Sequence, residues 1–250
     1  GKVIFEGEDI TALSPEALRR KRKDMQIVFQ DPFSSLDPRH TVQRILEEPL
    51  IVHGVGNAKE RKQMIDRLID VVGLTQSHLQ RYPHQFSGGQ RQRIGIARAL
   101  AVKPDFLVCD EAVAALDVSI QAQILNLFMT LRRELDLTYL FISHDLGVVQ
   151  HISDRIFIMY LGRIVEMAPT EEFFKKPNHP YAQALLAEVP RLGLTKRQFK
   201  PIEGEIPSPL DPPSGCHFHP RCPHATERCK TEAPSYREVG SDHFVACHLV

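Results

Sequence analysis

The chain has 250 residues, of which 42% are hydrophobic and 25% charged, so it can bury one large core or two smaller ones. Lysine and arginine total 31, as do aspartate and glutamate, which removes the broad positive field expected for nucleic-acid binding. The longest apolar run, 156–161, is far shorter than the roughly 20 residues of a membrane-spanning helix. We therefore expect a globular chain with no membrane span and no nucleic-acid partner.

The first forty residues predict a strand, a short helix and a second strand. Apolar residues mark a short strand within 2–7, which a turn at Gly7 closes, and a second strand at 25–29. Between them, Ser14 can cap a helix, and Pro15 suits its first turn because that amide would be unpaired in any case. Basic residues at 19–23 then favour the end of this helix.

Residues 41–102 are predicted to be mainly helical, as an insert between strands. The clearest segment is 58–72, whose apolar residues have the spacing of one helix face. These residues are Met64, Ile65, Leu68, Ile69 and Val72.

The second half predicts a strand-helix-strand unit followed by a hairpin. The runs 106–109 and 139–142 are almost continuously apolar, which is typical of parallel strands buried on both faces. A helix at 119–136 separates them. Strands at 156–160 and 163–167, joined around Gly162, complete a hairpin.

A glycine-rich helix start stands at Phe86-Ser87-Gly88-Gly89-Gln90. The two glycines would let the backbone approach an anion, and the open amides of the following helix suit a phosphate. Taken alone, the same four residues could form a helix cap with no ligand.

Further polar residues follow three of the predicted strands. Asp110 and Glu111 end one strand, where open α/β sheets place their ligand chemistry, and adjacent carboxylates there can take different roles. His144 follows the next strand, and Gln30 follows the strand at 25–29. Each would pass as a surface residue by itself.

Together, the order and intervals of these motifs resemble the signature, Walker B, D-loop, switch-histidine and Q-loop set of ABC-transporter ATPases. The resemblance implies ATP and Mg²⁺ as cofactors, with Glu111 polarising the attacking water, His144 contacting the γ-phosphate, and Asp110 in the Mg²⁺ shell. It implies nucleotide contacts from Ser87, Gly88, Gly89, Gln90, Gln30 and Asp117, with Gln30 also near the metal.

The fold implied by this resemblance is α/β, a P-loop NTPase-like core with a helical subdomain and a small cysteine-rich extension. Its expected parts are a core segment with the Q-loop at 1–40, a helical subdomain ending in the signature at 41–103, core strands at 104–168 and the extension at 169–250. No glycine-rich loop ending in Gly-Lys-Ser/Thr occurs in the 250 residues. We therefore expect an N-terminally truncated fragment, inactive alone, that completes its site with a second ATPase subunit.

Two further segments narrow the resemblance to the ATP-binding subunits of dipeptide, oligopeptide, nickel and glutathione importers. They are 29–38 and the His179-Pro180-Tyr181 string. This implies transmembrane permease subunits as partners, a homodimer or heterodimer of ATPase subunits, and indirect contact with an extracytoplasmic solute-binding protein. The expected location is the cytoplasmic face of the cell membrane. Alternatives are a soluble ABC ATPase outside transport and a nucleotide-free interaction fragment.

Four cysteines, Cys216, Cys222, Cys229 and Cys247, follow a proline-rich connector that contains Pro201, Pro207, Pro209, Pro212 and Pro213. A reducing compartment favours metal over disulfides, and the absence of tight Cys-x-x-Cys pairs suits a group larger than one zinc ion. In the resembled family this pattern holds a 4Fe-4S cluster. Zinc, with nearby histidines, and two disulfides are the alternatives.

Overall fold

The computed structural model describes residues 1–189 and 202–250, which divide into two compact units, 1–144 (unit 1) and 145–250 (unit 2). Unit 1 is ordered as β1 (Ile4–Phe5), β2 (Glu8–Asp9), η1 (Ile10–Ala12), α1 (Pro15–Lys21), β3 (Met25–Val28), α2 (Val42–Val52), α3 (Ala58–Val71), η2 (Gln76–His78), η3 (Pro83–Gln85), α4 (Gly88–Leu100), β4 (Phe106–Asp110), α5 (Val118–Leu135) and β5 (Thr138–Ile142). The described part of unit 2 is ordered as α6 (Leu146–Ile152), β6 (Arg155–Tyr160), β7 (Arg163–Pro169), α7 (Thr170–Lys175), α8 (Pro180–Glu188), η4 (His219–Arg221), α9 (Glu227–Thr231), β8 (Tyr236–Gly240) and β9 (His243–Ala246).

The N-terminal strand predicted within 2–7 is confirmed as β1, and β2, which was not predicted, returns alongside it to form a small antiparallel hairpin. The chain reverses at Glu6 and Gly7, both with positive φ (49° and 80°), which confirms the predicted glycine turn at the end of this strand. The predicted helix is confirmed as α1, where the Ser14 hydroxyl accepts a hydrogen bond from the Ala17 amide.

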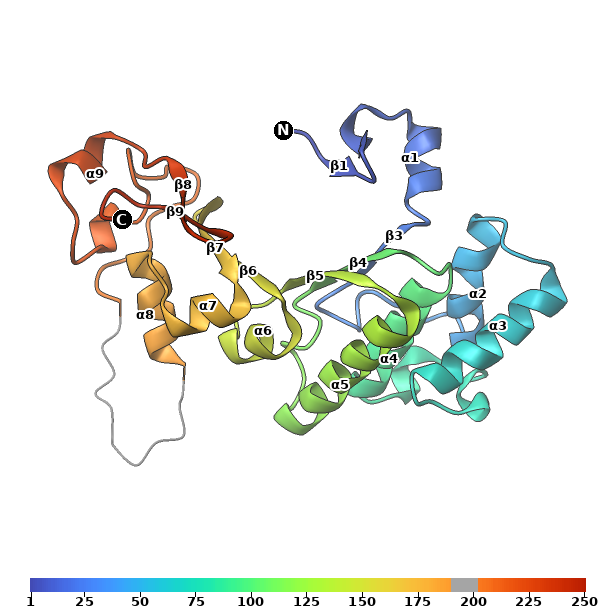
Figure 1. The fold of residues 1–250 in the computed structure, drawn as a ribbon. Coiled ribbons are helices and arrows are strands. Elements are labelled where there is room, and N and C mark those ends of the chain that lie inside the picture. Colours follow the sequence, from blue (N-terminus) through green and yellow to red (C-terminus); the bar gives the residue numbers. More distant parts are fainter. Residues whose placement is uncertain (190–201) are drawn as a thin grey trace. The chain divides into compact units, whose positions relative to one another are not determined.

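Three parallel strands in the order β3-β4-β5 form the sheet of unit 1, which confirms the predicted strand-helix-strand unit. Figure 1 shows these strands above α4 and α5. The expectation that both faces of the strands are buried is wrong for this chain. Leu140 and Ile142 of β5 are each 44% exposed because the helices α4 and α5 cover only one side of the strands.

The predicted helical insert consists of α2, α3 and α4, whose first turns are capped by Thr41, Asn57 and Ser87. The face predicted for 58–72 is confirmed, because Ile65, Ile69 and Val72 are buried. No described helix combines the length and the apolar composition needed to cross a bilayer.

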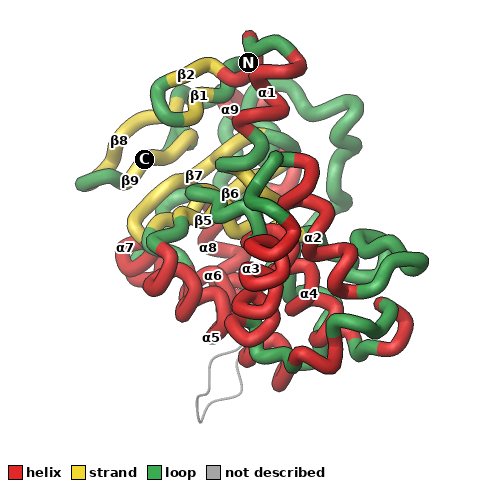
Figure 2. Tube along the Cα trace, turned by 90° about the vertical axis from the view of Figure 1, so that its right-hand side faces the viewer, coloured by secondary structure: helices red, strands yellow, loops and turns green. Residues whose placement is uncertain are grey.

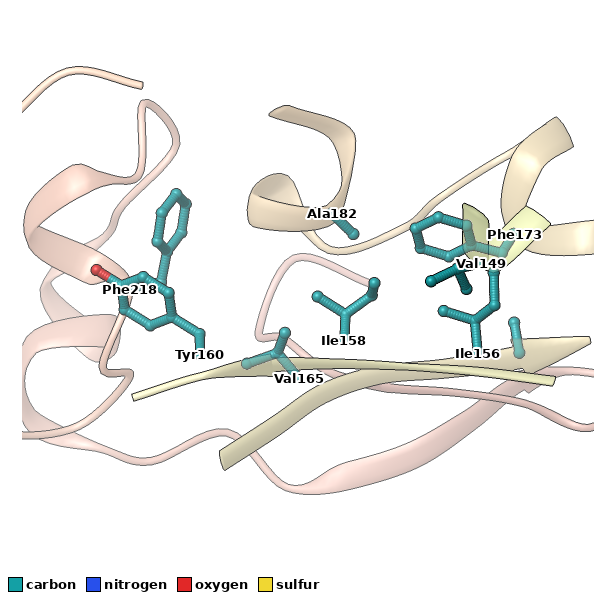
Figure 3. Packing of buried hydrophobic residues seen from close by; sticks show 9 residues of the cluster. Val149, Ile156, Ile158, Tyr160, Val165, Phe173, Ala182 and Phe218 are labelled. Atoms are coloured by element: carbon teal, nitrogen blue, oxygen red, sulfur yellow. The ribbon is translucent and has the colours of Figure 1, made fainter. Parts of the chain in front are cut away.

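Unit 2 contains an antiparallel sheet in the order β6-β7-β9-β8, drawn in yellow in Figure 2. The hairpin of β6 and β7 was predicted, whereas β8, β9 and the surrounding helices were not. Figure 3 shows the core on this sheet, where Ile156 lies below Phe173, Ile158 lies below Ala182, and Tyr160 lies beside Phe218. Of the proline-rich connector, Pro201 lies outside the described residues, and 202–213 contains no helix or strand.

A completely buried carboxylate links the hairpin to the rest of unit 2. Glu166 Oε1 accepts hydrogen bonds from the Asn178 amide (2.8 Å) and lies 2.7 Å from His243 Nε2, while Oε2 accepts from the His179 amide (2.7 Å). These partners belong to the start of α8 and to β9, so one side chain joins three segments. Both oxygens of this buried group have partners, as the burial of a polar group requires.

Candidate functional site

The residues predicted at the strand ends of unit 1 do come together. Gln30 Nε2 donates to Glu111 Oε2 at 2.5 Å, and His144 Nδ1 lies 3.2 Å from Glu111 Oε1. The parallel register causes this meeting, because Val28 of β3 pairs with Cys109 and Asp110 of β4 pairs with Ile142. The carboxyl ends of the three strands therefore lie side by side at one edge.

Glu111 has an unusual backbone for a non-glycine residue, with a φ of 45°. Its amide still donates to the Ile142 carbonyl at 3.0 Å, which anchors the bend immediately after β4. Backbone strain of this kind costs about 1–3 kcal/mol and is concentrated at functional sites. The bend directs the carboxylate toward Gln30 and His144 while leaving it 27% exposed.

The loop that carries Gln30 rests on α4 through polar residues that the sequence analysis did not identify. Gln92 Nε2 donates to the Phe29 carbonyl at 3.5 Å, and Arg98 Nη1 donates to the Ser35 carbonyl. The Arg91 guanidinium stacks 3.5 Å from the centre of the Phe33 ring, a cation–π contact. The signal available in the sequence was a run of large polar residues in a helix otherwise rich in alanine and isoleucine.

The glycine-rich motif has the predicted helix-start geometry. Ser87 Oγ accepts from the Gln90 amide (3.4 Å), and Gln90 Oε1 accepts from the Ser87 amide (3.1 Å). This reciprocal capping box leaves the amides of Gly88 and Gly89 at the open N-terminal end of a 13-residue helix. Such an end favours an anion.

Asp110 and Asp117 complete the predicted set in unit 1. Asp110 is the final residue of β4 and is partly exposed beside Glu111. Asp117 is the exposed N-cap residue of α5, and its own side chain makes no capping hydrogen bond. Both carboxylates are therefore accessible at the surface of the unit.

The four cysteines of unit 2 are free thiols in one neighbourhood. The Cys216 amide donates to the Cys229 carbonyl (2.8 Å), and Cys216 and Cys222 pack against the aromatic core. Burial raises the pKa of Cys216, Cys222 and Cys247, and the charges of the neighbouring thiols add to this rise. Within 1–189 and 202–250, however, no three His, Cys, Asp or Glu side chains converge closely enough to hold a metal ion. The geometry of the described residues thus supports neither the expected 4Fe-4S cluster nor the zinc alternative.

The remaining cysteine, Cys109, behaves as the core residue that its position in a strand suggests. It is completely buried in β4, and burial raises the pKa of its thiol well above the usual range.

Comparisons with known proteins agree in both units. Residues 1–114 match the family profile described as ABC transporter, and 165–229 match that described as oligopeptide/dipeptide transporter, C-terminal region. The oligopeptide transport ATP-binding protein AppF of Bacillus subtilis is 53% identical over 253 residues, covering 100% of this chain and 77% of AppF. The dipeptide transport ATP-binding protein DppF of Haemophilus influenzae is 48% identical, covering 99% of this chain and 76% of DppF.

Among solved structures, the ATP-binding cassette MJ0796, a dimer in a post-hydrolysis state with ADP and Pi, has a TM-score of 0.61. It is 29% identical and covers 68% of this chain and 73% of its own. The match to a transporter-specific C-terminal region argues against the alternative of an ATPase outside transport.

Proposed function

This chain belongs to the ATP-binding subunits of oligopeptide and dipeptide ABC transporters, and from that premise we propose that it hydrolyses ATP to drive peptide import. The observation that carries the proposal is the contact of Gln30 and His144 with the two oxygens of Glu111. Its partners are permease subunits in the membrane, whose transport is coupled to this hydrolysis. We place the ATP-binding subunit on their cytoplasmic side.

In this proposal Glu111 is the general base that orients and deprotonates the attacking water. A carboxylate can accept about four hydrogen bonds. Glu111 accepts one from Gln30 and has one oxygen beside His144, so it can still accept a hydrogen bond from a water. Because His144 is 73% exposed, the rest of its ring is free to contact a phosphate oxygen. Phosphoryl transfer depends mainly on such positioning and on charge compensation.

The residues near Glu111 also fit the oxygen chemistry that Mg²⁺ requires. The Asp110 carboxylate and the Gln30 amide oxygen are hard oxygen donors, and the Gln30 amide nitrogen is the part engaged by Glu111. Bound Mg²⁺ would neutralise charge on the phosphates. The amide oxygen of Gln30 would therefore be available to the metal while its amide nitrogen donates to Glu111.

The signature helix supplies the second half of the site to another subunit. The amides of Gly88 and Gly89 and the partial positive charge of α4 suit a γ-phosphate. The Ser87 hydroxyl oxygen is an acceptor in the capping box, so its hydrogen stays free to donate to the phosphate. Gln90 and Asp117 flank this position. A head-to-tail dimer, whether of two identical or two related subunits, would complete each site.

For Cys216, Cys222, Cys229 and Cys247 we propose a 4Fe-4S cluster. Four thiols are the donor set such clusters use, and the hydrogen bond from the Cys216 amide to the Cys229 carbonyl (2.8 Å) joins two of the four segments that carry them. Iron and acid-labile sulfide are measured after anaerobic purification, with a Cys222→Ser variant for comparison. About four of each per chain, reduced in the variant, is expected; zinc alone, or no metal, contradicts the assignment.

The principal test is Glu111→Gln in the full-length subunit assembled with its permease in proteoliposomes. ATP binding should be retained, while hydrolysis and peptide uptake fall by 100-fold or more, since the amide cannot accept the proton. Glu171→Gln on α7 is the matched control, because its side chain is 89% exposed and distant in sequence from the motifs. Undiminished hydrolysis by Glu111→Gln removes Glu111 from the role of base.

A further inference from the structure

The two signature glycines differ in what an added side chain would meet within the chain. A Cβ placed on Gly88 would lie 3.7 Å from Leu116 Cδ2, an ordinary van der Waals contact. A Cβ placed on Gly89 would overlap Ile120 Cγ2 severely. The chain itself therefore leaves room for alanine at Gly88 and none at Gly89.

The overlap at Gly89 comes from the first turn of α5. Gly89 is buried in α4, and the β-branched methyl group of Ile120 occupies the space where its side chain would be. Close packing of this kind requires one helix without a Cβ, because interiors leave little room for adjustment.

A second contact joins the same two helices one turn further along. Arg93 Nη2 donates to Gln123 Oε1 at 3.3 Å, and Arg93 Nη1 donates to the Val72 carbonyl at the end of α3 at 2.7 Å. Residues four apart on α4 and three apart on α5 lie on one helix face each, so the two contacts define one continuous seam. Figure 1 shows α4 and α5 side by side.

From this seam we infer that Ile120 is a positioning residue for catalysis: its β-methyl group, locked against Gly89, fixes the signature helix start relative to the segment carrying Asp117. This inference rests on the function proposed above. Ser87 and Asp117 are the N-cap residues of the two helices and lie at the same end of the seam, so displacement of one helix start displaces the other. Leu116, against Gly88, closes the gap between them.

The position of the clash allows a sharp test. Leucine has no methyl group on its Cβ, so Ile120→Leu removes Cγ2 while keeping the size of the side chain. Valine keeps both branches at Cβ, so Ile120→Val is the matched control that retains the clash. Only the leucine variant should make room for alanine at Gly89.

The experiment measures kcat and KM for ATP in the full-length subunit assembled with its permease. Gly89→Ala should lower kcat at least tenfold. Adding Ile120→Leu should return kcat to within about threefold of the Ile120→Leu single variant, whereas adding Ile120→Val should not improve it. Melting temperatures are recorded for every variant, and kcat is compared only among those that fold.

Rescue by both Ile120 substitutions, or by neither, overturns the inference. Gly88→Ala should also lose activity, because its added methyl group would block the approach of the phosphate. Ile120→Leu should not restore that activity. If it does, the effect of Ile120 is not specific to Gly89, and the inference is wrong. Failure of this inference can be told apart from failure of the proposed function. If the proposed function is wrong, Glu111→Gln retains full hydrolysis in the same assay.

Discussion

Glu111 in unit 1 and Glu166 in unit 2 have similar partners and opposite surroundings. Each lies beside a histidine and accepts a hydrogen bond from an amide, at distances between 2.5 and 3.2 Å. The Glu111 side chain is 27% exposed and its histidine 73%, whereas the corresponding values for Glu166 and its histidine are 0% and 9%. Partners alone therefore do not distinguish a reactive carboxylate from a structural one; access to solvent and unused acceptor capacity do.

The strongest test of this contrast replaces each carboxylate by leucine. Glu166→Leu leaves two backbone amides and a histidine without a buried partner, so we expect unit 2 to lose about 3 kcal/mol of stability. Hydrogen exchange measured by mass spectrometry in β6–β9 should increase accordingly. Glu111→Leu removes only exposed contacts, and exchange in β3–β5 should change little. An equal increase in hydrogen exchange in the two units would show that the two carboxylates contribute alike to stability.

Acid provides a second test, through His179 beside Glu166. Burial lowers the pKa of His179 to about 4, and its Nδ1 accepts from the Tyr181 amide. The folded state therefore holds the neutral ring, while the unfolded chain takes up a proton near its ordinary pKa of about 6.5. Stability should fall as the pH falls from about 6.5 to about 4, by up to about 3 kcal/mol, and this loss is absent above that window.

The control for this effect is the variant His179→Asn. Asparagine can still cap the start of α8, but its side chain does not titrate. Urea unfolding of both proteins at pH 7 and pH 4.5 gives the difference directly. If the two proteins lose stability equally on acidification, His179 is not the source.

The smallest expected change in stability comes from backbone strain. Of the two glutamates, only Glu111 has a positive φ. Glycine adopts positive φ readily, so Glu111→Gly should stabilise unit 1 by about 1 kcal/mol while abolishing hydrolysis. Glu111→Gln keeps the strain and should give no such gain. Thermal unfolding of the three proteins decides, and a lower melting temperature for Glu111→Gly would show that its side-chain contacts outweigh the strain.

The sequence was most informative where local pattern and global structure agree. Apolar runs predicted β3, β4, β5 and the hairpin of unit 2, and cap residues such as Ser14 and Ser87 located helix starts. The resemblance to ABC ATPases placed Gln30, Glu111 and His144 in one site, and the rule that parallel strands end at one edge explains why they gather there. The elements themselves needed only short-range periodicity and cap residues.

Long-range pairing was not predictable in the same way. β8 is exposed along its whole length, so it lacks the alternation that marks a strand. The carboxylate of Glu166 finds its partners 12, 13 and 77 residues away, and glutamate is ordinarily a surface residue. The support of the Gln30 loop by α4 spans 63 residues, at Gln92 and at Arg98. No local pattern encodes such contacts.

The in-register pairing of β3, β4 and β5 also determines which changes of length the protein can tolerate. The connections between these strands can be lengthened at low cost, because loop-closure entropy grows slowly with length. One residue inserted within β4 is different. It would reverse the facing of every later side chain in the strand and carry Glu111 past the positions of Gln30 and His144. For this site, a deleted or inserted codon in five residues of strand would be more damaging than a long insertion outside them.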